Sequence, residues 1–177
     1  MTGGERSNRH QLVLVRHAKS SWDDATVPDH DRPLAGRGHK ALRRMQAHLE
    51  DRRIRPDVVL CSSARRTRET LDGIRDGLGG HPRVEIEDAL YGADAEDLLA
   101  RLALIDDDIK RVLVIGHNPG IADLVDLLTA RDSPTPPPDA VPTGAIAVLS
   151  FAGPWRRLGP AAASLDSFWQ PRSRADG

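Results

Sequence analysis

The stretch LVLVRHA at residues 12–18 joins a run of large aliphatic residues to an arginine and a histidine. The run from Leu12 to Val15 does not alternate with polar residues, which is typical of a strand that is buried on both faces. Strands of this kind belong to parallel sheets that are covered by helices. The sequence therefore places Arg16 and His17 directly after a central strand.

Similar apolar runs recur along the chain and predict strands at residues 58–60, 112–115 and 145–151, with a shorter strand at 84–86. Apolar residues at helical spacing lie between these runs, within residues 42–49, 71–78, 98–105 and 121–128. Strands that alternate with helices predict an α/β fold. We therefore expect a three-layer sandwich, with a mostly parallel central sheet and helices on both faces.

The chain of 177 residues has the length of one domain, and we expect residues 1–177 to form a single domain. Its two ends, residues 1–10 and 172–177, are polar and are expected to be flexible tails. The segment SPTPPPDAVP at residues 133–142 fits neither a helix nor a central strand, because proline lacks the backbone N–H group. We expect it to be a stiff surface connection, the alternative being a ligand for a proline-recognising module.

The composition excludes several classes of protein. Hydrophobic residues make up 39% of the chain and charged residues 29%, a balance that fits neither a disordered nor a membrane protein. The formal net charge of −1 lacks the basic excess of a nucleic-acid binder. Cys61 is the only cysteine, so an intrachain disulfide and a multi-cysteine metal site are excluded. Residues 1–10 contain no apolar signal-peptide region, and we expect a cytoplasmic protein.

Polar residues follow three of the predicted strands. Ligands of open α/β sheets bind beyond the carboxyl ends of the strands. Arg16 and His17 follow the first strand, Arg65 and Arg66 follow the second, and His117 follows the strand at residues 112–115. The sequence therefore predicts that two histidines and several arginines converge at one edge of the sheet.

This set of residues points to an anionic ligand. Arg66 is expected in the first turn of a helix, where a positive charge opposes the helix dipole unless an anion is bound. His117 lies next to the predicted start of another helix, whose free N–H groups also favour an anion. Guanidinium groups bind phosphate in a planar, bidentate fashion. We therefore predict a phosphate site.

Other kinds of site lack their sequence signatures. The remaining histidines are scattered and show no HExxH or comparable ligand spacing, so no metal is expected. Neither a P-loop nor a GxGxxG pattern is present, and a GxSxG nucleophile elbow is also missing. We therefore expect a site that needs neither a metal nor a cofactor.

The same residues resemble the signature segments of the histidine phosphatase superfamily, which has the phosphoglycerate mutase-like fold. Residues 12–18 resemble its Arg-His-Gly motif, and GHNP at residues 116–119 resembles the segment with its second catalytic histidine. SSARRTRETL at residues 62–71 resembles its second motif, in which serine precedes and threonine follows the phosphate-binding arginine by four residues. That spacing assigns Arg66 rather than Arg65 to the phosphate.

The segment at residues 19–38, which contains KSSWDD and DHDRPLAGRG, is similar to the SixA-type phosphohistidine phosphatase branch of this superfamily. Ala18 departs from the pattern, because it replaces the glycine of the Arg-His-Gly motif. The proton donor is also unclear. A family glutamate stands four residues before a glycine, which points to Asp88 here, with Glu87 beside it; both residues are alternatively ordinary solvated carboxylates.

The resemblance implies a metal-independent phosphohydrolase in which His17 is the nucleophile and forms a covalent phosphohistidine. Arg16, Arg66 and His117 would bind the phosphate, and Asp88 would donate a proton. We expect the substrate to be phosphohistidine on a partner protein, because no long insertion after Arg66 offers a lid over the site. A small phosphoester is the alternative substrate, and a non-catalytic phosphate-binding module is a second alternative. Inorganic phosphate would be the product, and we expect neither nucleic acid nor a membrane as a partner.

Overall fold

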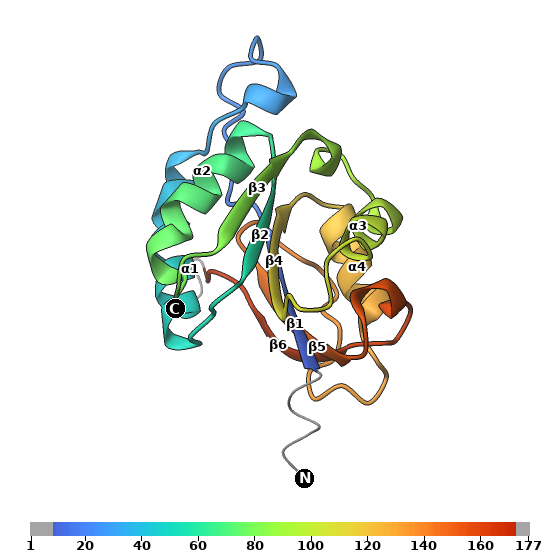
Figure 1. Ribbon diagram of the computed structural model, residues 1–177. Coiled ribbons are helices and arrows are strands. Elements are labelled where there is room, and N and C mark those ends of the chain that lie inside the picture. Colours follow the sequence, from blue (N-terminus) through green and yellow to red (C-terminus); the bar gives the residue numbers. More distant parts are fainter. Residues whose placement is uncertain (1–8, 173–177) are drawn as a thin grey trace.

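The computed structural model describes residues 9–172 and contains a mixed sheet of six strands (Figure 1). The strands are β1 (Arg9–Arg16), β2 (Val58–Ser62), β3 (Arg83–Glu87), β4 (Arg111–Gly116), β5 (Ile146–Ala152) and β6 (Ser164–Trp169). They lie in the order β3-β2-β4-β1-β5-β6 across the sheet. The four strands from β3 to β1 pair in parallel, whereas β5 pairs with β1 and β6 in antiparallel fashion.

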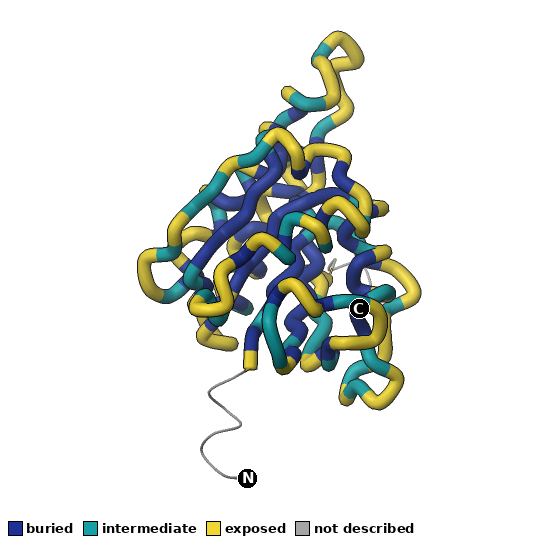
Figure 2. Tube along the Cα trace, turned by 45° about the vertical axis from the view of Figure 1, so that its right-hand side comes forward, coloured by how far each residue is buried: buried dark blue, intermediate teal, exposed yellow. Residues whose placement is uncertain are grey.

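Helices cover both faces of this sheet (Figure 1). They are α1 (Gly36–Asp51), α2 (Arg65–Ile74), α3 (Ala95–Leu102) and α4 (Gly120–Leu128). Side chains of β1 alternate between two apolar cores: Leu12 and Leu14 pack on the side of α3 and α4, and Val13 and Val15 pack on the side of α1 and α2. The uninterrupted apolar runs therefore reflect strands with two buried faces, which are the dark blue segments of Figure 2.

The expected three-layer α/β sandwich with a mostly parallel sheet is confirmed, and the structure differs from the expectation in two strands. The run at residues 145–151 forms β5, which is antiparallel to its neighbours. The edge strand β6 was not predicted, because only Leu165 of its six residues is buried. The sequence SLDSFW therefore contains no apolar run. In addition, the register of β6 against β5 shifts between Val148 and Leu149, where the pairing is interrupted by a bulge.

Two residues of the expected N-terminal tail belong to the sheet instead. Arg9 and His10 belong to β1, where they pair with Ala152 and Phe151 of β5. The His10 ring is buried and stacks on Phe151 at a centroid distance of 5.2 Å, which explains its place in the sheet. The rest of the expected N-terminal tail and residues 173–177 lie outside the described residues.

Two connections reach the carboxyl edge of the parallel strands. Residues 17–35 join β1 to α1 and project beyond the sheet, with mostly exposed side chains and a short 3₁₀ turn at Asp29–Asp31 (Figures 1 and 2). The proline-rich segment 133–142 has no regular secondary structure, but its second-to-last residue, Val141, is buried and contacts Arg16 at the end of β1. None of the helices in the described part of the chain is long and apolar enough to span a membrane.

Candidate active site

Strand register brings the two predicted histidines together. Arg16 lies opposite Gly116 in the parallel pair of β1 and β4, so His17 and His117 leave the sheet at the same level. The backbone N–H of His17 donates to the Gly116 carbonyl at 3.1 Å, and the two imidazole centroids lie 5.2 Å apart. Arg66 comes from the first turn of α2, after β2 on the other side of β4. The structure therefore gathers these four residues at one edge of the sheet.

The His17 side chain is held in one tautomer. Its Nδ1 atom lies 2.7 Å from the Ala18 carbonyl oxygen, and a carbonyl only accepts, so Nδ1 carries the hydrogen. The lone pair of the neutral ring is then on Nε2. Burial lowers the pKa of His17 to about 4, and the charges of Arg66 and Arg16 act in the same direction. At pH 7 this imidazole is neutral and has the lone pair that a nucleophile needs.

His117 is also buried and neutral at pH 7. Its pKa is lowered to about 3, mainly by burial, and the neighbouring His17 and Arg66 act in the same direction. Its Nε2 atom lies 2.8 Å from the Ser62 hydroxyl oxygen. Its Nδ1 atom is buried and has no hydrogen-bond partner within residues 9–172. Since buried polar atoms normally have partners, this nitrogen is available to a bound ligand.

The two arginines add positive charge to the histidine pair. The Arg16 Nη1 atom donates to the Val141 carbonyl at 2.9 Å, while its buried Nε atom has no partner among the described residues. Burial lowers the pKa of Arg16, and the positive charge of Arg66 acts in the same direction. A dianion between the two guanidinium groups would offset both positive charges and satisfy the free donors.

Asp29 supplies the carboxylate that already faces Arg66. The Arg66 Nη2 atom lies 3.1 Å from Asp29 Oδ2, and Nη1 donates to the Asp29 backbone carbonyl at 2.7 Å. The Tyr91 hydroxyl donates to the same Oδ2 at 2.5 Å. This hydrogen bond, together with Arg66, holds the pKa of Asp29 below its usual value, so the carboxylate is ionised at pH 7.

The Tyr91 ring contacts two histidine rings and so links His30 to the site. It stands edge-on to His117 at a centroid distance of 5.6 Å and to His30 at 4.9 Å. His30 in turn places Nε2 3.0 Å from the Ser63 hydroxyl. Our sequence reasoning missed Asp29, His30 and Tyr91 as site residues. The signals were present in DHDRP and in ALYG, but these stretches were used only as family signatures.

The other residues considered from the sequence lie elsewhere. Arg65 is exposed and pairs with Glu69 at 2.8 Å. Asp88 is exposed, and within residues 9–172 its side chain forms neither a hydrogen bond nor an ion pair. Glu87 accepts hydrogen bonds from Arg101 at 2.8 and 3.0 Å. The structure therefore leaves Arg65 and Glu87 in surface ion pairs, and Asp88 at the end of β3 without a contact to the histidine pair.

Ser62 and Thr70, the serine and threonine of the second motif, form hydrogen bonds with the site residues or with the backbone beside them. Thr70 Oγ1 accepts from the Ala18 backbone N–H at 3.0 Å and donates to the Arg66 carbonyl at 2.7 Å. Ser62 contacts His117, as described above. The Ala18 methyl group is fully buried in the core beside α1 and α2, and Ala18 is not among the described residues with positive φ. An alanine thus fits at this position without backbone strain.

The chemistry of the site follows from these groups. A neutral imidazole with a free Nε2 lone pair lies among two guanidinium groups and a second imidazole, an arrangement suited to a tetrahedral dianion. Cys61 is buried, which raises its pKa to about 12, so it remains a thiol at pH 7. Within residues 9–172, no three His, Cys, Asp or Glu side chains gather in a metal-binding arrangement.

Comparisons with known proteins agree with this geometry. The model of the histidine phosphatase superfamily (branch 1) matches residues 12–101. An uncharacterised protein of Mycobacterium tuberculosis is 34% identical over 163 residues, which cover 89% of this chain and 100% of that protein. Phosphohistidine phosphatase SixA of Escherichia coli K12 is 30% identical over 143 residues, which cover 80% of this chain and 85% of that protein.

Solved structures show the same fold. A structure from Nakamurella multipartitia, assigned as a SixA phosphohistidine phosphatase, superposes with a TM-score of 0.78 at 33% identity, covering 93% of this chain and 98% of that chain. The protein histidine phosphatase SixA complexed with tungstate superposes with a TM-score of 0.74 at 26% identity, covering 91% and 97% of the two chains. These relatives support phosphatase activity, and the chain belongs to branch 1 of the histidine phosphatase superfamily.

Proposed function

We propose that this protein is a metal-independent phosphohydrolase whose nucleophile is Nε2 of His17. The observation that carries the proposal is the hydrogen bond from His17 Nδ1 to the Ala18 carbonyl, in a buried ring beside Arg16 and Arg66. This bond leaves the lone pair on Nε2, and the lowered pKa of His17 keeps that lone pair free at pH 7. Attack on phosphorus then needs no separate base.

In the first step, the Nε2 lone pair forms a bond to phosphorus while the bond from phosphorus to the leaving group breaks. The leaving group departs with that electron pair: an alkoxide takes up a proton from an acid, whereas an imidazole whose second nitrogen is protonated leaves as the neutral ring. Arg16, Arg66 and His117 would hold the phosphoryl oxygens, because phosphoryl transfer depends mainly on positioning and on electrostatic stabilisation. The unpartnered Arg16 Nε and His117 Nδ1 atoms support this assignment, since both are buried donors or acceptors without a described partner.

In the second step, water attacks the phosphorylated His17 and loses a proton to the Asp88 carboxylate or to bulk water. The phosphorus–nitrogen bond breaks, its electron pair returns to Nε2, and inorganic phosphate leaves. Asp88 remains our candidate for the acid, at the end of β3 beside the site-forming end of β2. The Asp29 carboxylate is less suited to donate a proton in the free protein, because its lowered pKa keeps it ionised.

The leaving group is proposed to be the imidazole of a phosphohistidine on a partner protein. Apart from Asp29, no carboxyl group of the described residues forms a hydrogen bond or an ion pair with the predicted site residues. An alkoxide leaving group needs strong help from an acid, whereas a phosphohistidine with a protonated second nitrogen expels neutral imidazole. The likeness to SixA proteins supports the same substrate class.

The test compares two phosphorylated peptides of the same sequence, one with phosphohistidine and one with phosphoserine at the same position. We expect phosphate release from the phosphohistidine peptide with a clearly higher kcat/KM, and no release from either peptide by His17→Ala. A preference for phosphoserine would instead support the small-phosphoester reading of the site. Binding of inorganic phosphate without turnover of either peptide, or of para-nitrophenyl phosphate, would identify a non-catalytic binding module.

A further inference from the structure

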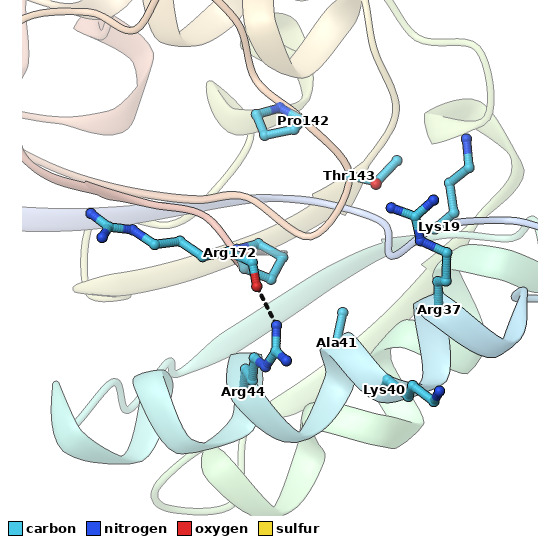
Figure 3. A pocket seen from close by; sticks show the side chains of 9 residues that line it. Lys19, Arg37, Lys40, Ala41, Arg44, Pro142, Thr143 and Arg172 are labelled. Carbon is cyan, nitrogen blue, oxygen red and sulfur yellow. Dashed lines mark hydrogen bonds between the residues drawn. The ribbon is translucent and has the colours of Figure 1, made fainter. Parts of the chain in front are cut away.

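A second cationic site lies beside the first, on the opposite side of the segment that follows β1. It is a pocket of about 430 Å³ between α1, the residues before β5 and the end of the described chain (Figure 3). Five positively charged residues line it, namely Lys19, Arg37, Lys40 and Arg44, together with Arg172 at the end of the described chain. We refer to this site as the basic pocket. Its other walls include Pro142 and Thr143.

The charges of the basic pocket are not compensated. None of these five cationic side chains forms an ion pair with any residue in the part of the chain that the structure describes. No Asp or Glu within residues 9–172 lines it, although the chain as a whole is slightly acidic. Lys19 and Arg37 extend together on one side of the pocket, and Arg44 donates to the Arg172 carbonyl on the other (Figure 3). A bound anion would relieve the repulsion among these unpaired cations.

The spacing of the cations indicates the shape of that anion. Arg37, Lys40 and Arg44 lie three and four residues apart on α1, so they share one face of the helix. At about 1.5 Å rise per residue, this row extends over roughly 10 Å. Lys19 continues the row from the end of β1. A single phosphate is too small to pair with such a row, whereas acidic side chains spaced along one face of a second helix match its length and charge.

The basic pocket is linked to the candidate active site through shared backbone. Its wall residues Pro142 and Thr143 directly follow Val141, whose carbonyl accepts from Arg16. The next residue, Gly144, donates its N–H to the His17 carbonyl at 3.0 Å. Lys19 itself is two residues from His17. A partner that presents a group to His17 therefore lies within reach of the basic pocket.

We propose that the basic pocket docks an acidic helix face of the phosphohistidine-bearing partner protein, next to the phosphorylated side chain. This inference rests on the proposed function for the identity of the partner, but the docking itself is a separate interaction. Exposed ion pairs are individually weak, but three or four of them together change affinity by about tenfold. The effect is screened by salt, because the cations are exposed.

The experiment uses two synthetic helical peptides that each carry one phosphohistidine. In one peptide, three glutamates are spaced at i, i+3 and i+7 beside the phosphohistidine, and in the other they are glutamines. We expect kcat/KM for the glutamate peptide to be about tenfold higher at low salt, and the difference to shrink as salt is added. The double variant Arg37→Glu/Arg44→Glu should abolish or reverse the difference, because its new carboxylates repel the glutamate peptide, while it still cleaves the glutamine peptide normally.

A matched control has the same change in net charge on other exposed positions of the same region, Arg43→Glu with Arg52→Glu. This control should retain the preference for the glutamate peptide. Equal kcat/KM for both peptides, or an equal loss of preference in both double variants, would overturn the docking proposal. Competition by single-stranded DNA that is tighter than binding of the glutamate peptide, and that depends on Arg37 and Arg44, would also overturn it in favour of a nucleic-acid site.

Direct binding separates this inference from the proposed function. The unphosphorylated forms of both peptides are titrated into the wild-type protein by calorimetry. If neither phosphorylated peptide is cleaved, the proposed function fails, yet a lower Kd for the glutamate form that Arg37→Glu/Arg44→Glu removes still supports docking. If cleavage is normal and the two unphosphorylated peptides bind equally, the docking proposal fails and the proposed function stands.

Discussion

The Nδ1 atom of His17 donates to the carbonyl oxygen of the adjacent residue, Ala18, at 2.7 Å. The backbone of the residue next to the proposed nucleophile therefore selects the tautomer, a task that a carboxylate side chain performs for many other histidines. Ala18 is held in turn, because its N–H donates to Thr70 Oγ1 on α2 at 3.0 Å. The orientation of His17 thus depends on the packing of α2 against the end of β1.

The buried histidine predicts a specific loss of stability in acid. In the unfolded chain His17 has its ordinary pKa of 6.5, whereas burial lowers the pKa in the folded protein to about 4. Below pH 6.5 the unfolded state binds a proton that the folded state does not, so stability present at neutral pH is lost as pH falls.

The effect of His17 approaches ~3 kcal/mol near pH 4. Denaturant unfolding of the wild type and of His17→Gln from pH 7 to 4 measures it. We expect the wild type to lose stability relative to the variant over this range. A difference between the two proteins that stays constant with pH would contradict a neutral, buried His17.

Arg66 and Arg65 should differ sharply in phosphate binding, although they are adjacent. Arg66 is buried beside His17 and His117, whereas Arg65 pairs with Glu69 on the surface. Loss of a charge-assisted hydrogen bond costs roughly 1.5–3 kcal/mol, so Arg66→Ala should weaken vanadate binding by about ten- to a hundredfold. Arg65→Ala should have little effect. If Arg65→Ala proves the more damaging variant, the assignment of the arginine is wrong by one residue.

Asp29 is expected to compete with the phosphate for Arg66. Its carboxylate pairs with Arg66 at 3.1 Å and is about half exposed, so the pair contributes roughly 0.2–1 kcal/mol. Asp29→Asn should therefore tighten inhibition by inorganic phosphate by up to about fivefold. Asp31→Asn is the control, because Asp31 pairs with His30 instead. Weaker inhibition in Asp29→Asn would show that this carboxylate supports the phosphate site.

The role of Asp88 as an acid is tested through the leaving group. General acid catalysis is typically worth about 10²–10⁴-fold, so Asp88→Asn should slow hydrolysis of an alkyl phosphoester by a factor in that range. Hydrolysis of a phosphohistidine peptide should fall much less, because neutral imidazole leaves readily. Glu87→Gln should instead lower the melting temperature, since it weakens the pairing with Arg101. An equal decrease for both substrates in Asp88→Asn would assign Asp88 to positioning.

The sequence predicted an element best where the same physical requirement, such as burial on both faces, produces both the residue pattern and the structure. Apolar runs predicted β1, β2 and β4, because strands buried on both faces need an apolar residue at each position. The spacing around Arg66 was informative for a related reason. Ser62 lies four residues before Arg66 and contacts the His117 ring. Thr70 lies four residues after Arg66 and accepts from the backbone N–H of Ala18, the residue next to His17.

The remaining features depend on contacts that no local pattern records. Asp29 and Tyr91 are 62 residues apart, and both are exposed in part, so neither periodicity nor burial marks them. The strand β6 is an edge strand with one buried residue, and its pairing to β5 is decided by the tertiary fold. Val141 lies in the proline-rich segment that we expected to be a plain connection, but its carbonyl contacts both Arg16 and Asn118.

The most direct test of the central claim is to trap the phosphorylated protein. Wild-type protein is mixed rapidly with a ³²P-labelled phosphohistidine peptide, quenched in alkali, and digested to locate the label. Phosphohistidine survives alkali and is lost in acid, and we expect an alkali-stable, acid-labile label on the peptide that contains His17. His17→Ala should remain folded and carry no label. Label that persists in His17→Ala, or turnover of the substrate by that variant, would contradict the assignment of His17 as the nucleophile.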